Sequence, residues 1–311
     1  MNRTLLLGNG INIHLGIDSL KACEIRKRFN KNLKIYKPLI EKMFDVNMNK
    51  VVEGYSNVAE DESIEKLVTI LEESIIKNHK EYLTKNDVIR LEDIIVDIGL
   101  TSIFFDVETV INFKRQDVAL KLAEYKNIFT LNYYEFWDEN NICKYLHGEF
   151  DLSMYDNTKK KILISEKWKN IPEYKKIIDE IHKENDIDIL YRNNTDVILS
   201  SANKSKDELH YVAGLYPSND IYPSDDLQLN NCKQLYEELD GIEHLDIYGM
   251  SPYGDDAIIN KIKKVKDVRV YVYNIKRYEK KDAKHDNSLE KWKKVLLTTN
   301  CKFLDSDEFV I

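Results

Sequence analysis

The first apolar run of the chain, Leu5-Leu6-Leu7, ends in the glycine-flanked turn Gly8-Asn9-Gly10. Consecutive aliphatic residues bounded by turn residues are typical of a strand buried on both faces of a parallel sheet. In such sheets the turn after the first strand opens a nucleotide pocket, and the next helix directs its amides at a phosphate. The dinucleotide fingerprint Gly-x-Gly-x-x-Gly is not met, because Ile13 takes the place of the third glycine. A plain strand-to-helix turn is therefore the alternative interpretation.

After this turn, the hydrophobic pattern is helical from about residue 19 to residue 125. Within 63–76 the apolar side chains recur at helical spacing, with Glu and Lys on the opposite face: Ile64, Leu67, Val68, Leu71 and Ile75. A second helical region covers 86–113, and its dense apolar stretch at 94–105 is expected to be buried. The pattern predicts a mainly helical insertion of about a hundred residues after the first strand.

Strand patterns return at 127–132, 142–146, 161–164, 196–200, 245–248 and 268–273. Helical patterns separate the last four of them, at 173–183, 228–239 and 255–264. Alternating strands and helices with short loops indicate parallel pairing and right-handed crossovers. The tail adds a helix at 288–297 and a short strand at 308–311. We therefore predict an α/β fold with a Rossmann-like parallel sheet, and one domain that spans residues 1–311.

Composition narrows the class of protein. The formal net charge of −8 disfavours a nucleic-acid groove, which needs a basic excess to release counterions. No apolar stretch approaches the roughly 18 residues that a membrane span requires, and the N-terminus does not have the pattern of a signal peptide. The four cysteines are scattered, without a Cys-x-x-Cys pair. We expect a cytoplasmic, reduced protein that uses no metal, nucleic acid or membrane.

Three polar clusters stand at the ends of predicted strands. The first is the turn 8–12, and the third is 248–256, which contains Gly249 and Ser251. The second is Thr130-Leu131-Asn132-Tyr133-Tyr134, followed by His147-Gly148. The carboxyl ends of parallel strands line one edge of an open sheet, so the three clusters are expected to meet in one crevice.

The order of these motifs resembles that of the sirtuin-like superfamily. It is similar above all to the bacterial sirtuin-like defence proteins and the AbiH-type abortive-infection family. The resemblance implies NAD as substrate or ligand, with two catalytic residues, His147 as the base and Asn132 at the nicotinamide ribose. It also implies a set of NAD-contacting residues: Gly8, Asn9, Gly10, Asn12, Thr130, Tyr133, Gly249, Ser251 and Asn274.

The function that the resemblance implies is hydrolysis of NAD to nicotinamide and ADP-ribose in anti-phage defence. A homo-oligomer or a phage-derived activator would then be the expected partner. The chain departs from the family pattern at Tyr134, where an acid is usual, and it lacks the sirtuin Gly-Ala-Gly-x-Ser motif and zinc cysteines. The zinc module seats the peptide substrate of deacetylases, so protein deacetylation is not expected.

The chemistry of the reaction supports the same residues. Cleavage of the nicotinamide–ribose bond passes through an oxocarbenium-like transition state. Nicotinamide leaves as a neutral molecule, so the leaving group needs little help from a general acid. A base near the ribose hydroxyls suits His147, and an uncharged amide that holds the attacking water suits Asn132. The alternatives are that His147 only satisfies a backbone carbonyl and that Asn132 only caps a strand end.

A second functional class is a nucleotide-binding sensor or partner module without turnover. The missing acid at Tyr134 favours this class slightly, whereas the joint presence of Asn132 and His147 favours the hydrolase.

His14 could touch a phosphate, but a histidine at a helix start is usually only part-exposed. The aromatic residues at 133–137 are expected to pack in the core rather than to stack on a ligand. Acids at 255–256 are expected to complement a helix dipole.

Overall fold

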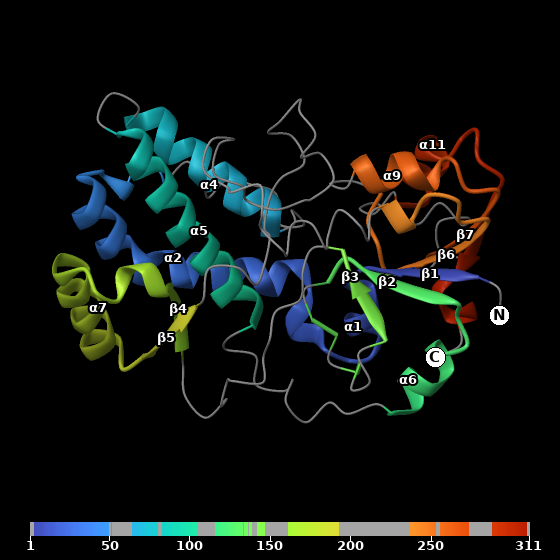
Figure 1. Ribbon diagram of the computed structural model, residues 1–311, viewed down its shortest axis with the longest axis horizontal. Helices are drawn as coiled ribbons and strands as arrows, with labels where there is room; N and C mark the ends of the chain where they lie inside the picture. The colour runs from blue at the N-terminus through green and yellow to red at the C-terminus, as the bar shows by residue number, and fades with distance from the viewer. Residues whose placement is uncertain are drawn as a thin grey trace.

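The computed structural model describes the following residues, and every structural statement below concerns them: 3–49, 51, 64–79, 83–104, 116–132, 134–135, 137–138, 142–146, 161–192, 237–252, 256–273 and 288–309. The chain forms two lobes that lie side by side (Figure 1). We call them the sheet lobe and the helical lobe.

The sheet lobe is built on a six-stranded sheet in the order β3-β2-β1-β6-β7-β8, in which every pairing is parallel. Its strands are β1 (Thr4–Leu7), β2 (Asn127–Thr130), β3 (Cys143–Tyr145), β6 (His244–Tyr248), β7 (Asp267–Val272) and β8 (Cys301–Asp305). The strand order reverses between β1 and β6, which is the point where open α/β sheets bind ligands. The predicted Rossmann-like α/β fold is confirmed.

The leucine run of β1 lies in the middle of this sheet, and its three side chains are fully buried. Leu6 packs with α9 (Asp256–Ile262) and α11 (Ser288–Val295) on one face. Leu5 and Leu7 pack with α1 (Gly10–His14) and α6 (Gln116–Leu122) on the other face. Because side chains alternate along a strand, a continuous apolar run is needed where both faces are covered.

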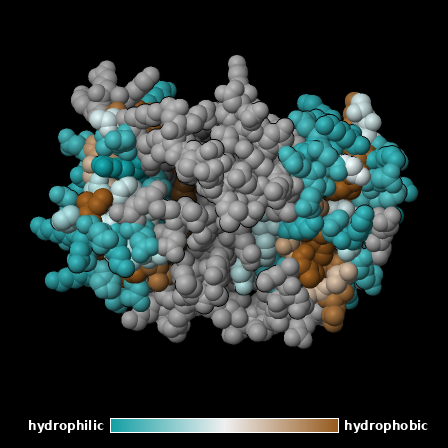
Figure 2. Space-filling view, viewed as in Figure 1, coloured by the Kyte–Doolittle hydropathy of each residue, from teal (hydrophilic) through white to brown (hydrophobic). Residues whose placement is uncertain are grey.

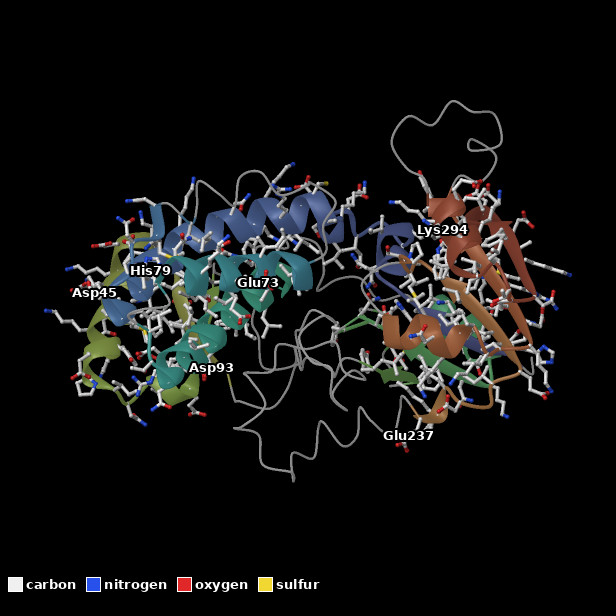
Figure 3. The ribbon with its side chains drawn as sticks, turned by 90° about the horizontal axis from the view of Figure 1, so that it is seen from above. Asp45, Glu73, His79, Asp93, Glu237 and Lys294 are labelled. Carbon is white, nitrogen blue, oxygen red and sulfur yellow. The ribbon has the colours of Figure 1, made fainter. Side chains whose placement is uncertain are left out.

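The helical lobe contains α2 (Ala22–Phe44), α4 (Ile64–His79), α5 (Lys85–Phe104), α7 (Pro172–Asn185), β4 (Lys161–Ser165) and β5 (Asp188–Arg192). These elements share one hydrophobic core of their own, separate from the two cores of the sheet lobe. Figure 3 shows Asp45, Glu73, His79 and Asp93 on this lobe, and Glu237 and Lys294 on the sheet lobe. The mainly helical insertion after the first strand is confirmed.

The strand at 161–164 does not join the main sheet. It forms β4, which pairs in parallel with β5 in a separate two-stranded sheet packed against α5. Backbone amides tie β4 to α5, since Leu163 donates to Thr101 Oγ1 (3.1 Å) and Ser165 donates to Asp97 Oδ2 (2.8 Å). The predicted strand at 196–200 and most of the predicted helix at 228–239 lie outside the described residues.

The predicted strand at 308–311 is wrong at residues 308 and 309, which are its described part. The last described strand is β8, and the chain then turns through a 3₁₀ helix at Ser306–Glu308. The side chain of Asp305 accepts from the amide of Asp307 (3.1 Å), and the Glu308 carboxylate accepts from the amide of Asp305 (3.3 Å). This reciprocal capping ends the strand early.

A charged network joins β1, β6 and β7 at the amino edge of the sheet. Arg3 donates to Asp246 (2.6 Å), to Asp267 (2.5 Å) and to the carbonyl of Leu245 (3.0 Å). Tyr125 donates to the second oxygen of Asp246 (3.0 Å). Asp246 is buried, and these donors compensate its desolvation.

The described surface of both lobes is mostly hydrophilic in Figure 2, with a hydrophobic patch on the side of α6. Leu120 of α6 is one of the exposed large hydrophobic residues. Within the described segments, no helix is both long and apolar enough to cross a membrane.

Candidate functional site

Two turns at the carboxyl ends of β1 and β6 are in direct backbone contact. The amide of Gly8 donates to the carbonyl of Tyr248 (2.9 Å), and the amide of Gly10 donates to the carbonyl of Gly249 (3.0 Å). A Cβ at Gly10 would lie 2.4 Å from the Cα of Gly249, and one at Gly8 would lie 2.5 Å from the Gly249 oxygen. Gly249 itself has a φ of +70°, which favours glycine. The close approach of the two turns therefore requires all three glycines.

This backbone contact accounts for the need for glycine at positions 8 and 10 without a bound phosphate. Their amides already donate to the β6 turn, and α1 is only five residues long. Asn9 is also used within the fold, because its side-chain amide donates to the carbonyl of Leu20 (2.5 Å) and ties the turn to the start of the helical insertion. A plain, tightly packed strand-to-helix turn accounts for this motif.

A buried carboxyl group, Glu135, organises the polar residues at the end of β2. Its carboxyl group accepts hydrogen bonds from Thr130 Oγ1 (2.6 Å), from Asn132 Nδ2 (2.7 Å) and from Trp137 Nε1 (3.0 Å). The side-chain amide of Asn12, on α1, is a fourth donor. Four neutral donors thus converge on one carboxyl group that is 1% exposed.

Burial raises the pKa of Glu135 to about 7, although its four hydrogen bonds favour the carboxylate and lower the pKa. Among the described residues, no charged side chain forms a hydrogen bond or ion pair with this group. The group is therefore divided between its neutral and ionised forms near neutral pH. A pKa near the working pH is common at functional sites.

The surrounding elements hold this segment in place. The amide of Asn132 donates to Thr130 Oγ1 (3.0 Å), and the amide of Glu135 donates to the Tyr145 hydroxyl (3.3 Å) on β3. Trp137 is fully buried in the sheet lobe, whereas Tyr134 packs against the core of the helical lobe. Glu135 is thus fixed from both sides by its aromatic neighbours.

Asn12 connects the glycine turn with Glu135, because it lies two residues after Gly10. It is 1% exposed, and its Oδ1 has no hydrogen-bond partner among the described residues. A buried acceptor without a partner costs about 1–3 kcal/mol of folding free energy. A ligand or a water molecule that donates a hydrogen bond at this position would recover that cost.

The structure brings the predicted site residues together in two groups. Gly8, Gly10 and Gly249 meet in the interlocked turns, while Asn12, Thr130 and Asn132 meet around Glu135. Ser251 is exposed, two residues beyond Gly249. Three predicted residues lie outside the described part of the chain: Tyr133, His147 and Asn274.

The last described residue before His147 is tied to the same edge of the sheet. Leu146 follows β3 and donates its amide to the carbonyl of Thr130 (2.9 Å). Leu146 therefore lies beside the end of β2. No metal-binding group of three or more His, Cys, Asp or Glu side chains is found in the described segments.

Sequence reasoning missed Glu135. The prediction looked for an acid at the position of Tyr134, but the carboxyl group comes one residue later. An available signal was the single acid within an aromatic stretch expected to be buried, because such an acid must have several donors around it. The aromatic residues Tyr134 and Trp137 do pack in hydrophobic cores.

His14 is exposed, and its Nδ1 is hydrogen-bonded to the hydroxyl of Tyr248 (2.5 Å). Tyr248 stacks on Phe309, with ring centroids 4.3 Å apart. The contact ties α1 to the end of β6, so a structural role accounts for His14.

Comparisons of the chain with known protein families, with curated proteins and with solved structures found no match. The function is therefore argued from the chemistry of the residues around Glu135.

Proposed function

We propose that the chain binds NAD at the carboxyl edge of its sheet and hydrolyses it to nicotinamide and ADP-ribose. The observation that supports this most strongly is the convergence of Asn12, Thr130 and Asn132 on Glu135, beside the point where the strand order reverses. Uncharged amides beside a titrating carboxyl group suit the binding of hydroxyl groups and water.

In the proposed reaction, a water oxygen forms a bond to the anomeric carbon of the nicotinamide ribose. The glycosidic carbon–nitrogen bond breaks, and its electron pair returns to the pyridinium ring, so neutral nicotinamide leaves. One proton of the water is released to a base. We assign the positioning of the water to Asn132 and acceptance of the proton to His147, as the resemblance to sirtuin-like proteins implies.

A role in anti-phage defence belongs to the same proposal, with a homo-oligomer or a phage-derived component as the activator. A nucleotide-binding sensor without turnover is the second candidate. The argument for the sensor was that Tyr134 stands where the family pattern has an acid. Glu135 supplies an acid at this end of β2, hydrogen-bonded to Asn132, and this supports the hydrolase over the sensor.

The test is the release of nicotinamide from NAD by the purified protein, alone and after exposure to phage components. We expect Asn132→Ala and His147→Ala each to lower turnover by about 10²-fold or more. The melting temperature should barely change in His147→Ala, whereas Asn132→Ala should lower it because a donor to the buried Glu135 carboxyl group is lost. Asn127→Ala is a matched control, because Asn127 begins β2 at the opposite edge of the sheet. This variant should keep full turnover.

Two results would count against the hydrolase. Wild-type protein that binds NAD but releases no nicotinamide, even when activated and assembled, would favour the sensor. A large loss of stability in His147→Ala, with NAD affinity retained, would show that His147 is structural.

A further inference from the structure

The hydrogen bonds around Glu135 fix which end of each amide faces outward. A carboxylate only accepts hydrogen bonds, so both asparagine side chains must turn their NH₂ groups toward it. Asn132 does so at 2.7 Å, and Asn12 is the second amide donor. An amide that donates from its nitrogen end must present its oxygen elsewhere. The Oδ1 atoms of both residues are therefore left as acceptors.

We propose that Glu135 is a positioning residue, which holds Asn12 and Asn132 so that both amide oxygens accept hydrogen bonds from the attacking water and a neighbouring ribose hydroxyl. This inference rests on the proposed function and assigns roles within the same site. It adds Asn12 and Glu135 to the residues on which turnover depends.

Acceptors are what a nucleophilic water needs. A water that donates its hydrogens to amide oxygens keeps a lone pair free to attack the anomeric carbon. An NH₂ group in the same place would donate to that lone pair and block it. The orientation of the two amides thus affects the chemical step more than substrate binding, because a ribose hydroxyl both donates and accepts.

The proton on Glu135 should control this orientation. When the group is neutral, its O–H must donate, so one neighbour has to change from donor to acceptor. The indole of Trp137 can only donate, and the Tyr145 hydroxyl is bonded to the Glu135 amide rather than to its carboxyl group. The Thr130 hydroxyl accepts from the backbone amide of Asn132, and its second lone pair can also accept from Glu135 after the hydroxyl rotates. The other candidates are the two asparagine amides, which can accept only after they turn.

The first test follows the side-chain NH₂ resonances of Asn12 and Asn132 by NMR between pH 5 and 9. We expect both to shift together with the Glu135 carboxyl resonance in the wild type, with a midpoint near the pKa of about 7. The shifts should persist in the matched control Glu72→Gln, which alters another buried glutamate in the helical lobe. They should be absent in Glu135→Gln. Side-chain NH₂ resonances of the wild type that do not shift as Glu135 titrates would overturn the inference.

The second test compares NAD hydrolysis by the same proteins. We expect Glu135→Gln to lower kcat by about 10-fold or more while KM changes by less than about 3-fold, because one amide then presents its NH₂ group to the water. Glu72→Gln should keep the wild-type values. A folded Glu135→Gln protein with wild-type kcat would overturn the inference and leave the hydrolase intact. If the wild type releases no nicotinamide, the proposed function fails, and the NMR titration alone decides the role of Glu135.

Discussion

At the scale of single residues, Glu135 shows how a buried acid is tolerated. An ionised carboxylate without partners would cost several kcal/mol in a protein interior. Hydrogen bonds from two amides, a hydroxyl and an indole offset much of that cost, and the pKa of about 7 reflects what remains. The sequence places an acid among aromatic residues, but the donors come from two separate segments, 130–137 and the helix that contains Asn12, and they are visible only in the fold.

The raised pKa of Glu135 predicts how stability depends on pH. The folded protein binds the proton up to about pH 7, whereas the unfolded chain releases it near 4.5. Its contribution is therefore complete below pH 4.5 and is lost as pH rises through 7. Between pH 5 and 8, the free energy of unfolding measured with urea should fall by roughly 2–3 kcal/mol more in the wild type than in Glu135→Gln. Equal pH slopes for the two proteins would show that Glu135 is already ionised at pH 5.

At the scale of elements, local patterns predicted the first strand and the turn after it, as well as helices in the insertion. They could not show that the turn after β6 touches the turn after β1, because about 240 residues separate them. The same limit explains why the pattern could not assign β4 to a separate two-stranded sheet. Its apolar residues predicted a buried strand, but burial against α5 and burial in the main sheet give the same pattern.

Two glycine substitutions test the interlocked turns. In a helix, Gly10→Ala would ordinarily stabilise by about 0.5–1 kcal/mol. Here the new Cβ would meet the Gly249 backbone, so we expect a loss of about 2–3 kcal/mol in thermal or urea unfolding. Gly16→Ala is the control, since Gly16 has a φ of +95° and nothing within 4 Å. It should cost only about 1 kcal/mol of backbone strain. A neutral or stabilising Gly10→Ala would show that the turns are not in contact.

At the scale of the whole molecule, alternating patterns predicted a parallel sheet, and the site residues were sought at its carboxyl edge. The structure confirms the sheet and brings Asn12, Thr130 and Asn132 together there. It also shows that the segment after β2 contacts both lobes, through Tyr134 and Trp137. The separate core of the helical lobe could not be predicted, because it combines the insertion with residues 161–192.

The most direct test of the account is a crystal structure of the protein with carba-NAD, in which a methylene replaces the ring oxygen of the nicotinamide ribose and prevents cleavage. We predict that this ribose lies beside the end of β2, with a hydroxyl or a bound water within hydrogen-bond distance of Asn132 Oδ1 and Asn12 Oδ1. Carba-NAD bound away from these two residues, or no binding at millimolar concentration, would contradict the account.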